Sequence, residues 1–166
     1  EQVEAKLVDL STGKYTTVPE NYDQRKASRD PKLSDIIPGD RDPATLKRRE
    51  KYSFIYLVKM SDGTLDQIVL PIRGYGLWST LWGFLSIDAA TLEQEAAETT
   101  IRGLTFYEHK ETPGLGGEVD NPDWKAKWNG RENTKKIFDA EWNVLIEVIK
   151  GSVSPNDSAR EYKVDG

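Results

Sequence analysis

The sequence predicts an α+β protein built on a mostly antiparallel sheet with a few short helices. Three observations support this prediction. Apolar, β-branched and aromatic segments of strand length recur along the chain and are separated by turn signals. Segments with helix signals are short and few. Strands and helices do not alternate as they do in a parallel βαβ sheet, which leaves mainly antiparallel pairing.

One domain accounts for the length and the composition. A chain of 166 residues buries roughly two-thirds of its extended surface, which suffices for one core but not for two full-sized domains. We therefore expect residues 1–166 to form a single soluble domain. The net charge of −5 disfavours a phosphate backbone as a partner, so no nucleic acid is expected. The absence of cysteine excludes disulfides, thiolate nucleophiles and Cys-bound metal centres.

The start of the chain predicts that a segment upstream has been removed. The first residue is Glu1, and Met60 is the only methionine. A signal sequence or a membrane anchor is the usual candidate for such a segment. Within the chain, the longest apolar run, residues 76–87, is too short to cross a bilayer as a helix.

The N-terminal half is predicted to hold one short strand, a surface segment and a hairpin. Weak alternation at residues 5–10 indicates the strand. Residues 31–50 are charged and interrupted by prolines, which predicts a surface segment with short helical turns after Asp42-Pro43. The two β-rich runs 53–59 and 65–76, separated by a Ser-Asp-Gly turn, predict the hairpin.

The central segment is predicted to complete the sheet. Pro71 should place the end of the second hairpin strand at an edge or a bulge. Residues 77–88 alternate at period two, with Trp78 at the start of one face, and predict a strand buried on both sides. A helical turn or a long connection at residues 90–99 precedes the next strand, 100–109.

The C-terminal part is predicted to add one helix and two strands. Asn121-Pro122 supplies an N-cap with proline at the first helical position, and the helix should end at Asn129-Gly130. Its buried stripe is formed by Trp124 and Trp128, four residues apart. Two further strands are expected, at residues 143–151 and 160–164.

The stretch from His109 to Trp124, here termed the glycine loop, is the most informative part of the sequence. Pro113 fixes its entry, and its three glycines permit positive φ and a close approach of the backbone. Leu115 is left projecting from a tight bend. Such a leucine is either the plug of a local core or one face of a slot for an aromatic ring, and the sequence leaves both interpretations open.

Titratable residues around this loop carry weaker functional signals. His109 is either a general base or a polar residue at a strand end, and the second interpretation is favoured because no G-x-S-x-G elbow accompanies it. Together with Glu108, Glu111 and Glu118 it could suggest a metal site. The spacing, however, matches neither H-E-x-x-H nor an EF-hand loop, so solvated carboxylates are the favoured interpretation.

Residues 74–78, G-Y-G-L-W, contain half of a phosphate-binding G-x-G fingerprint and lack its third glycine. The segment enters a strand rather than opening a helix, so its glycines are expected to let the backbone turn or approach something flat. Trp78 lies beside this turn and is a candidate wall for a planar ligand.

Residues 74–88 and 105–130 together resemble the FMN-binding domain family, whose E-T-P-G-L-G core stands here at residues 111–116. G-L-W-S at 76–79 and G-G-E-V-D-N-P-x-W at 116–124 are similar to the NqrC subunits of the Na+-translocating NADH:quinone reductases. The related G-type subunit of the Rnf electron-transfer complex typically lacks that tryptophan. The resemblance covers most of the chain after residue 50 and is loose before it.

The resemblance implies a fold of the FMN-binding-domain type, held on the periplasmic side of the bacterial inner membrane by one N-terminal membrane helix. It also implies an FMN joined through its phosphate to a threonine in a late D-G-x-S-G-A-T-x-T/S motif. Asp165-Gly166 resembles the opening of that motif, so the attachment threonine is expected just beyond Gly166. The implied partners are a flavin transferase and the other subunits of a redox-driven sodium pump.

In this role FMN carries electrons between other redox centres, and the subunit has no catalytic residue and no metal of its own. By resemblance, Thr112 and Leu115 flank the isoalloxazine ring, Gly114 lets the backbone approach it, and Trp78 lines the slot. Lys150 is expected to supply positive charge near the phosphate or the ring. Two alternatives remain, an electron carrier of the Rnf G type and a structural module of the same fold without flavin.

Overall fold

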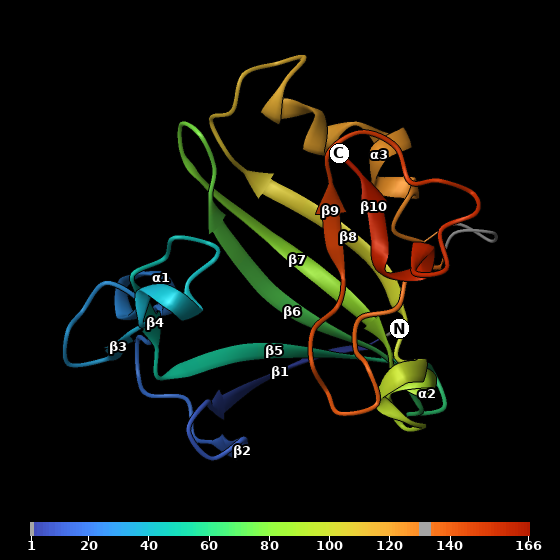
Figure 1. The fold of residues 1–166 in the computed structure, drawn as a ribbon. Coiled ribbons are helices and arrows are strands. Elements are labelled where there is room, and N and C mark those ends of the chain that lie inside the picture. The colour runs from blue at the N-terminus through green and yellow to red at the C-terminus, as the bar shows by residue number, and fades with distance from the viewer. Residues whose placement is uncertain (1, 130–133) are drawn as a thin grey trace.

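The computed structural model describes residues 2–129 and 134–166. Its main element is a six-stranded antiparallel sheet with the strand order β2-β1-β5-β6-β7-β8 (Figure 1). This sheet confirms the predicted α+β class with mostly antiparallel pairing. Its strands are β1 (Gln2–Asp9), β2 (Lys14–Thr16), β5 (Tyr52–Lys59), β6 (Leu65–Tyr75), β7 (Thr80–Asp88) and β8 (Ile101–Glu108).

The predicted central hairpin forms from β5 and β6. Gly63, in the turn between them, has a φ of +86°, a conformation that side chains with a Cβ rarely adopt. The second strand continues past Pro71 to Tyr75, close to the predicted end of the run at residue 76. Its pairing with β5 reaches only Val69, opposite Tyr56. Pro71 therefore lies in the part of β6 that pairs with β7 alone, which explains why the sheet tolerates a residue without an N–H.

The strand predicted over residues 77–88 begins later, at Thr80. Residues 76–79, here termed the hairpin tip, form a turn in which the N–H of Gly76 donates to the carbonyl of Ser79 at 2.7 Å. Trp78 is therefore not on a face of the sheet, and it is 66% exposed. The predicted strand starts too early because residues 77–79, which continue the alternating pattern, belong to this turn.

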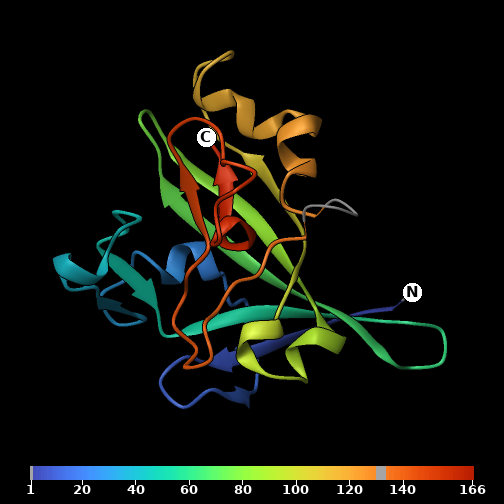
Figure 2. The same ribbon diagram turned by 45° about the vertical axis from the view of Figure 1, so that its right-hand side comes forward.

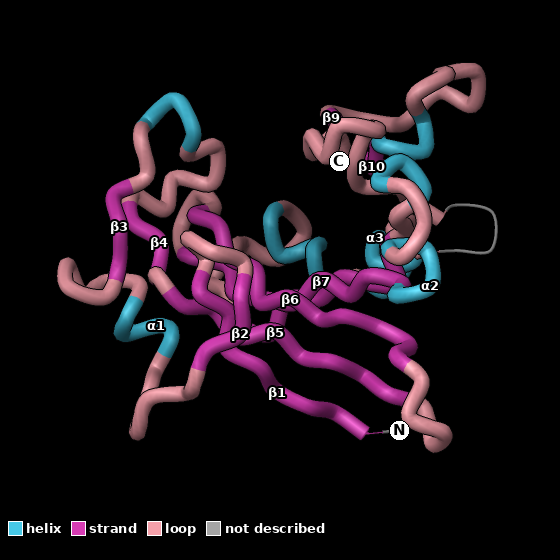
Figure 3. Tube along the Cα trace, turned by 90° about the horizontal axis from the view of Figure 1, so that it is seen from below, coloured by secondary structure: helices cyan, strands magenta, loops and turns pink. Residues whose placement is uncertain are grey.

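Residues 31–50 form a small β unit at one end of the sheet, on the opposite side from the C-terminal segments of the chain (Figure 3). The expected helical turns after Asp42-Pro43 do not form, because the Asp42 carboxylate accepts the backbone N–H groups of Leu46 and Lys47 at 2.8 and 2.7 Å. The elements of this β unit are β3 (Ser34–Ile36), η1 (Gly39–Arg41) and β4 (Arg48–Glu50), and α1 (Gln24–Ala27) comes just before it in the chain.

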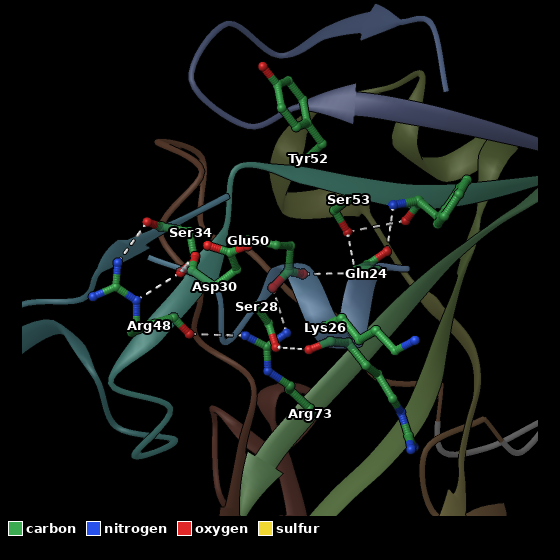
Figure 4. A network of polar contacts seen from close by, with 12 residues as sticks. Gln24, Lys26, Ser28, Asp30, Ser34, Arg48, Glu50, Tyr52, Ser53 and Arg73 are labelled. Atoms are coloured by element: carbon green, nitrogen blue, oxygen red, sulfur yellow. Dashed lines mark hydrogen bonds and ion pairs between the residues drawn. The ribbon is translucent and has the colours of Figure 1, made fainter. Parts of the chain in front are cut away.

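A buried polar network attaches this β unit to the main sheet (Figure 4). The carboxylate of Glu50 accepts hydrogen bonds from Arg73 on β6 at 2.6 Å and from Gln24 on α1 at 2.8 Å. The side-chain oxygen of Gln24 in turn accepts the backbone N–H of Phe54 at 2.8 Å. Arg73 also donates to the carbonyl of Arg48 at 3.0 Å. The network thus joins α1, β4, β5 and β6.

The main apolar core lies on one face of the sheet, under the helices and the C-terminal segments that cross it (Figures 1 and 2). The covering helices of the 89–126 region are short, and within residues 2–129 and 134–166 no helix is long and apolar enough to cross a bilayer. They are α2 (Ala89–Leu92), η2 (Ala96–Glu98), η3 (Gly116–Asp120) and α3 (Pro122–Ala126). The buried cluster consists of Ile87, Ile101, Trp128, Ile137 and Val164.

Helix α3 begins as predicted, because the side chain of Asn121 accepts the N–H of Asp123 at 2.9 Å. Trp124 packs edge-on against the buried Trp128, with ring centroids 5.5 Å apart, which confirms the predicted stripe. The helix ends at Ala126, earlier than the predicted stop at Asn129-Gly130. Gly130 itself lies outside the described residues.

The two C-terminal strands are shorter than predicted and do not join the main sheet. Only β9 (Glu147–Ile149) forms within residues 143–151, and it pairs in parallel with β10 (Lys163–Asp165), which follows η4 (Arg160–Tyr162). A bridge between Phe138 and Val144 turns the chain back on itself just before β9, which shortens the predicted strand.

Candidate functional site

The glycine loop follows β8 and forms a tight turn at the end of the sheet that also holds the hairpin tip (Figure 1). The carbonyl of Thr112 accepts the N–H groups of Leu115 and Gly117 at 3.1 and 2.9 Å. Gly114, inside this turn, has a φ of +74°, so the glycine is required by the backbone. The side chain of Leu115 is 72% exposed, which excludes its interpretation as the plug of a local core.

Glu111 connects the glycine loop to the hairpin tip. Its Oε1 accepts the backbone N–H of Trp78 at 3.1 Å, the N–H of Ser79 at 3.0 Å and the hydroxyl of Ser79 at 3.1 Å. The same hydroxyl oxygen accepts the N–H of Lys110 at 2.8 Å. We term the three hydrogen bonds to Oε1 the Glu111 bridge.

The environment of Glu111 favours its ionised form. Burial alone would raise the pKa of this carboxyl, but the hydrogen bonds from Trp78 and Ser79 outweigh burial and hold the pKa below its ordinary value. Two glycines make room for the side chain. A Cβ at Gly76 would lie 2.5 Å from Oε1 of Glu111, and one at Gly116 would lie 3.0 Å from its Cβ. Spacing in the sequence carries no signal for this contact, which only the fold creates.

A cleft of about 510 Å³ lies beside the glycine loop. Its walls come from the loop itself, from α3, from β9 and from the end of β10. Trp124 lines the cleft from α3, and its Nε1 donates to the carbonyl of Asp165 in β10 at 2.9 Å. This hydrogen bond joins the α3 wall to the β10 wall. The lining residues are Gly114, Leu115, Gly116, Glu118, Val119, Asn121, Asp123, Trp124, Lys127, Val148 and Gly166.

The structure places two of the five predicted cofactor residues in the lining of the cleft and the other three outside it. Gly114 and Leu115 line the cleft. Thr112 lies in the same turn, where its carbonyl accepts two N–H groups, and Trp78 is held next to the loop by the Glu111 bridge. Lys150 is exposed in the turn after β9 and does not line the cleft.

His109 has a structural position at the start of the glycine loop. Its Nε2 lies 2.7 Å from Oδ2 of Asp120, and its Nδ1 accepts the N–H of Glu111 at 3.2 Å. Because Nδ1 accepts, the proton belongs on Nε2 and is donated to Asp120. The imidazole thus ties the two ends of the turn together, which agrees with the favoured interpretation of a polar residue at a strand end.

The carboxylates near His109 form ion pairs or hydrogen bonds with different partners and do not converge on one point. Glu108 pairs with Arg25 at 3.0 Å, and Glu118 accepts the N–H of Gly114 at 3.2 Å. Across residues 2–129 and 134–166, no group of three or more His, Asp or Glu side chains is arranged to hold a metal ion.

Comparisons with known proteins agree on one family. The FMN-binding domain model matches residues 76–166, which include the hairpin tip, the glycine loop and the whole cleft. The C-type subunit of the Na+-translocating NADH-quinone reductase of Pseudomonas aeruginosa is 47% identical over 167 residues, covering 99% of this chain. The same subunit of Neisseria meningitidis serogroup B is 42% identical over 166 residues. The chain spans 59% and 58% of the lengths of these two relatives.

Solved structures give the same result. The crystal structure of Shewanella oneidensis NqrC superimposes with a TM-score of 0.79 at 31% identity, covering 98% of this chain and 69% of that one. The C-type subunit of the Na+-translocating NADH-quinone reductase from Parabacteroides distasonis gives a TM-score of 0.62 at 26% identity, with coverages of 98% and 64%. On this evidence the chain belongs to the FMN-binding domain family, and within it to the NqrC family of Na+-translocating NADH-quinone reductase subunits.

Proposed function

We propose that this chain is the FMN-carrying domain of an electron-transfer subunit in a Na+-translocating NADH:quinone reductase. The observation that carries the proposal is the cleft beside the glycine loop, which lies within the part of the chain that matches the FMN-binding domain model. When bound, FMN supplies the ability to accept and release electrons, and the protein supplies binding, orientation and electrostatics. A domain with this task needs no catalytic acid or base.

The residues of the cleft fit such a cofactor. Leu115 stands free on its turn and can lie against one face of a planar ring. Val119, Trp124 and Val148 add apolar wall, while Asn121 and Lys127 add polar groups at the rim. Thr112 and Trp78 are outside the lining, but the turn and the Glu111 bridge join them to the loop that forms this wall. Lys150 lies one residue beyond β9 and is proposed to contribute positive charge to an anionic part of the cofactor.

The position of Gly166 supports covalent attachment by the motif that Asp165-Gly166 resembles. Gly166 lines the cleft, and the carbonyl of Asp165 is held there by Trp124. In D-G-x-S-G-A-T the threonine stands five residues after the glycine, a span of at most ~17 Å in extended chain. A threonine at that position would reach the cleft, and a flavin transferase would join it to the phosphate of FMN.

Partners and location are part of the same proposal. The domain would exchange electrons with other subunits of the sodium pump, on the periplasmic side of the bacterial inner membrane. A membrane tether would precede Gln2, which pairs with Lys59 at the end of the sheet away from the glycine loop (Figure 2). A tether at that end would leave the cleft open to a partner.

The test is the mass and the visible spectrum of the full-length subunit, produced with and without a periplasmic flavin transferase. We expect a mass gain of one FMN less one water and a flavin absorbance band only when the transferase is present. Leu115→Ala should then shift the flavin potential without lowering the stability of the domain, because Leu115 is exposed. An unmodified mass in the presence of the transferase would contradict the proposal.

A further inference from the structure

One carboxylate oxygen accepts three hydrogen bonds between the hairpin tip and the glycine loop, and a fourth runs from the N–H of Lys110 to the hydroxyl oxygen of Ser79 at 2.8 Å. All three hydrogen bonds of the Glu111 bridge end on Oε1, two from consecutive backbone N–H groups and one from the hydroxyl of Ser79. Hydrogen bonds to an ionised acceptor are roughly twice as strong as neutral ones. The bridge therefore outweighs any single neutral contact between the two segments.

The bridge connects the segments that carry Trp78 and Leu115, the two side chains that the proposed function places against a flavin ring. Glu111 is followed directly by Thr112, and Leu115 lies in the same turn. Trp78 is itself one of the bridged residues. Its side chain is 66% exposed, so neighbouring side chains do little to fix the position of its backbone. The remaining local restraints are the tight turn between Gly76 and Ser79 and the hydrogen bond from the N–H of Lys110 to the hydroxyl of Ser79.

We propose that Glu111 is a positioning residue, whose carboxylate sets the separation between Trp78 and Leu115 and thereby the width of the slot for a planar cofactor. The identity of the cofactor rests on the proposed function, whereas the bridge can be tested without any cofactor. Glu111 itself faces the hairpin tip and Gly116 rather than the cleft, so it acts through Trp78.

The chain offers a matched control in the same loop. Glu118 is also a carboxylate that accepts a backbone N–H, from Gly114 at 3.2 Å, and it accepts the amide of Asn121 at 3.1 Å. Both partners belong to the glycine loop, so Glu118 has no bond to the hairpin tip. Glu118→Gln changes the charge of the loop by the same amount as Glu111→Gln and leaves the bridge intact.

The first experiment measures amide hydrogen exchange and amide shifts by NMR in the present chain without cofactor. In Glu111→Ala, we expect the protection of the Trp78 and Ser79 amides to fall about tenfold, the loss that corresponds to one hydrogen bond. In Glu111→Gln the protection of these two amides should fall less, because the amide oxygen of glutamine can still accept their hydrogen bonds. Glu118→Gln should leave both amides unchanged. Unchanged protection of Trp78 and Ser79 in Glu111→Ala would overturn the proposal.

The second experiment uses the full-length subunit loaded with FMN. Glu111→Ala should shift the midpoint potential and reduce the quenching of flavin fluorescence, and Glu111→Gln should shift both less. In a Trp78→Ala background the quenching effect of Glu111→Ala should disappear, because Glu111 acts through that ring. Persistence of the effect in this background would refute the positioning role.

The two experiments distinguish a failure of the proposed function from a failure of the positioning role of Glu111. If the wild-type subunit takes up no FMN, the proposed function fails, and the exchange data still decide whether the bridge exists. If Glu111→Ala does not fold, Glu111→Gln carries both measurements. Circular dichroism and the midpoint of thermal unfolding identify that case.

Discussion

The carboxylate of Glu50 lies 2.6 Å from Nη1 of Arg73, and the two side chains are only 6% and 11% exposed. The pair joins β4 to β6 and is completed by Gln24, which donates to the other oxygen of Glu50 (Figure 4). Both charges are therefore compensated inside the protein, and the β unit of residues 31–50 depends on them for its attachment.

Arg73→Met is expected to lower the free energy of unfolding by about 3–5 kcal/mol, because it leaves the charge of Glu50 buried and uncompensated. Urea denaturation measures the effect. Arg102→Met is the control, since Arg102 pairs with Asp66 and Asp88 at 3.4 and 3.3 Å with 37% of its side chain exposed. The control should cost at most about 1 kcal/mol. Equal losses of unfolding free energy in the two variants would show that the buried pair contributes no more to stability than the exposed one.

Gly83→Ala is expected to destabilise the sheet by about 1–3 kcal/mol, because the added methyl group overlaps β8. A Cβ at Gly83 would collide with the carbonyl oxygen of Thr105 and with the ring of Phe106. Gly103→Ala is the matched control on β8, where a Cβ meets nothing within 4 Å. Thermal unfolding of both variants checks the prediction, which fails if Gly103→Ala is the more harmful change.

Thr99→Val is expected to raise the free energy of unfolding by about 1 kcal/mol, because it removes an unsatisfied polar atom at nearly constant volume. The side chain of Thr99 is fully buried, and its hydroxyl has no hydrogen-bond partner among the described residues. Thr99→Ser keeps the hydroxyl and loses the methyl group, so it should lower stability instead. Chemical denaturation of the pair gives the sign directly, and a loss of stability in Thr99→Val would reveal a partner for the hydroxyl.

Glu4 should titrate with a pKa of about 2, because Lys59 and then Lys6 hydrogen-bond its charged form. The lysine nitrogens lie 2.7 and 2.5 Å from the carboxylate oxygens. Since the folded-state pKa is below the unfolded value of about 4.3, this group stabilises the fold above that pH. The contribution is lost as the pH falls toward 2.

Carbon-13 NMR of the Glu4 carboxyl follows this titration directly. Lys59→Met should move the pKa back toward its ordinary value, because it removes the largest cause of the shift. A Glu4 carboxyl that titrates normally in the wild-type protein would mean that the lysines do not hold it in solution.

Local patterns in the sequence predicted the elements that depend on local chemistry. The hairpin of β5 and β6 follows from two β-rich runs around a turn containing Gly63, and the start of α3 follows from the N-cap Asn121. The tight bend that carries Leu115 was also predicted from local residues, Pro113 and the neighbouring glycines, whereas only the structure shows that Leu115 is exposed. The family resemblance then named the cofactor and the residues around it, and of these Gly114 and Leu115 line the cleft.

The tertiary structure decided how distant segments meet. Periodicity could not show that Trp78 leaves the strand, because the turn that removes it is closed by a hydrogen bond and by Glu111, 33 residues away. It could not show that the C-terminal strands β9 and β10 pair in parallel beside the main sheet and close the cleft. Such contacts depend on long-range packing, whereas spacing along the chain reports only which side chains share a face or a turn.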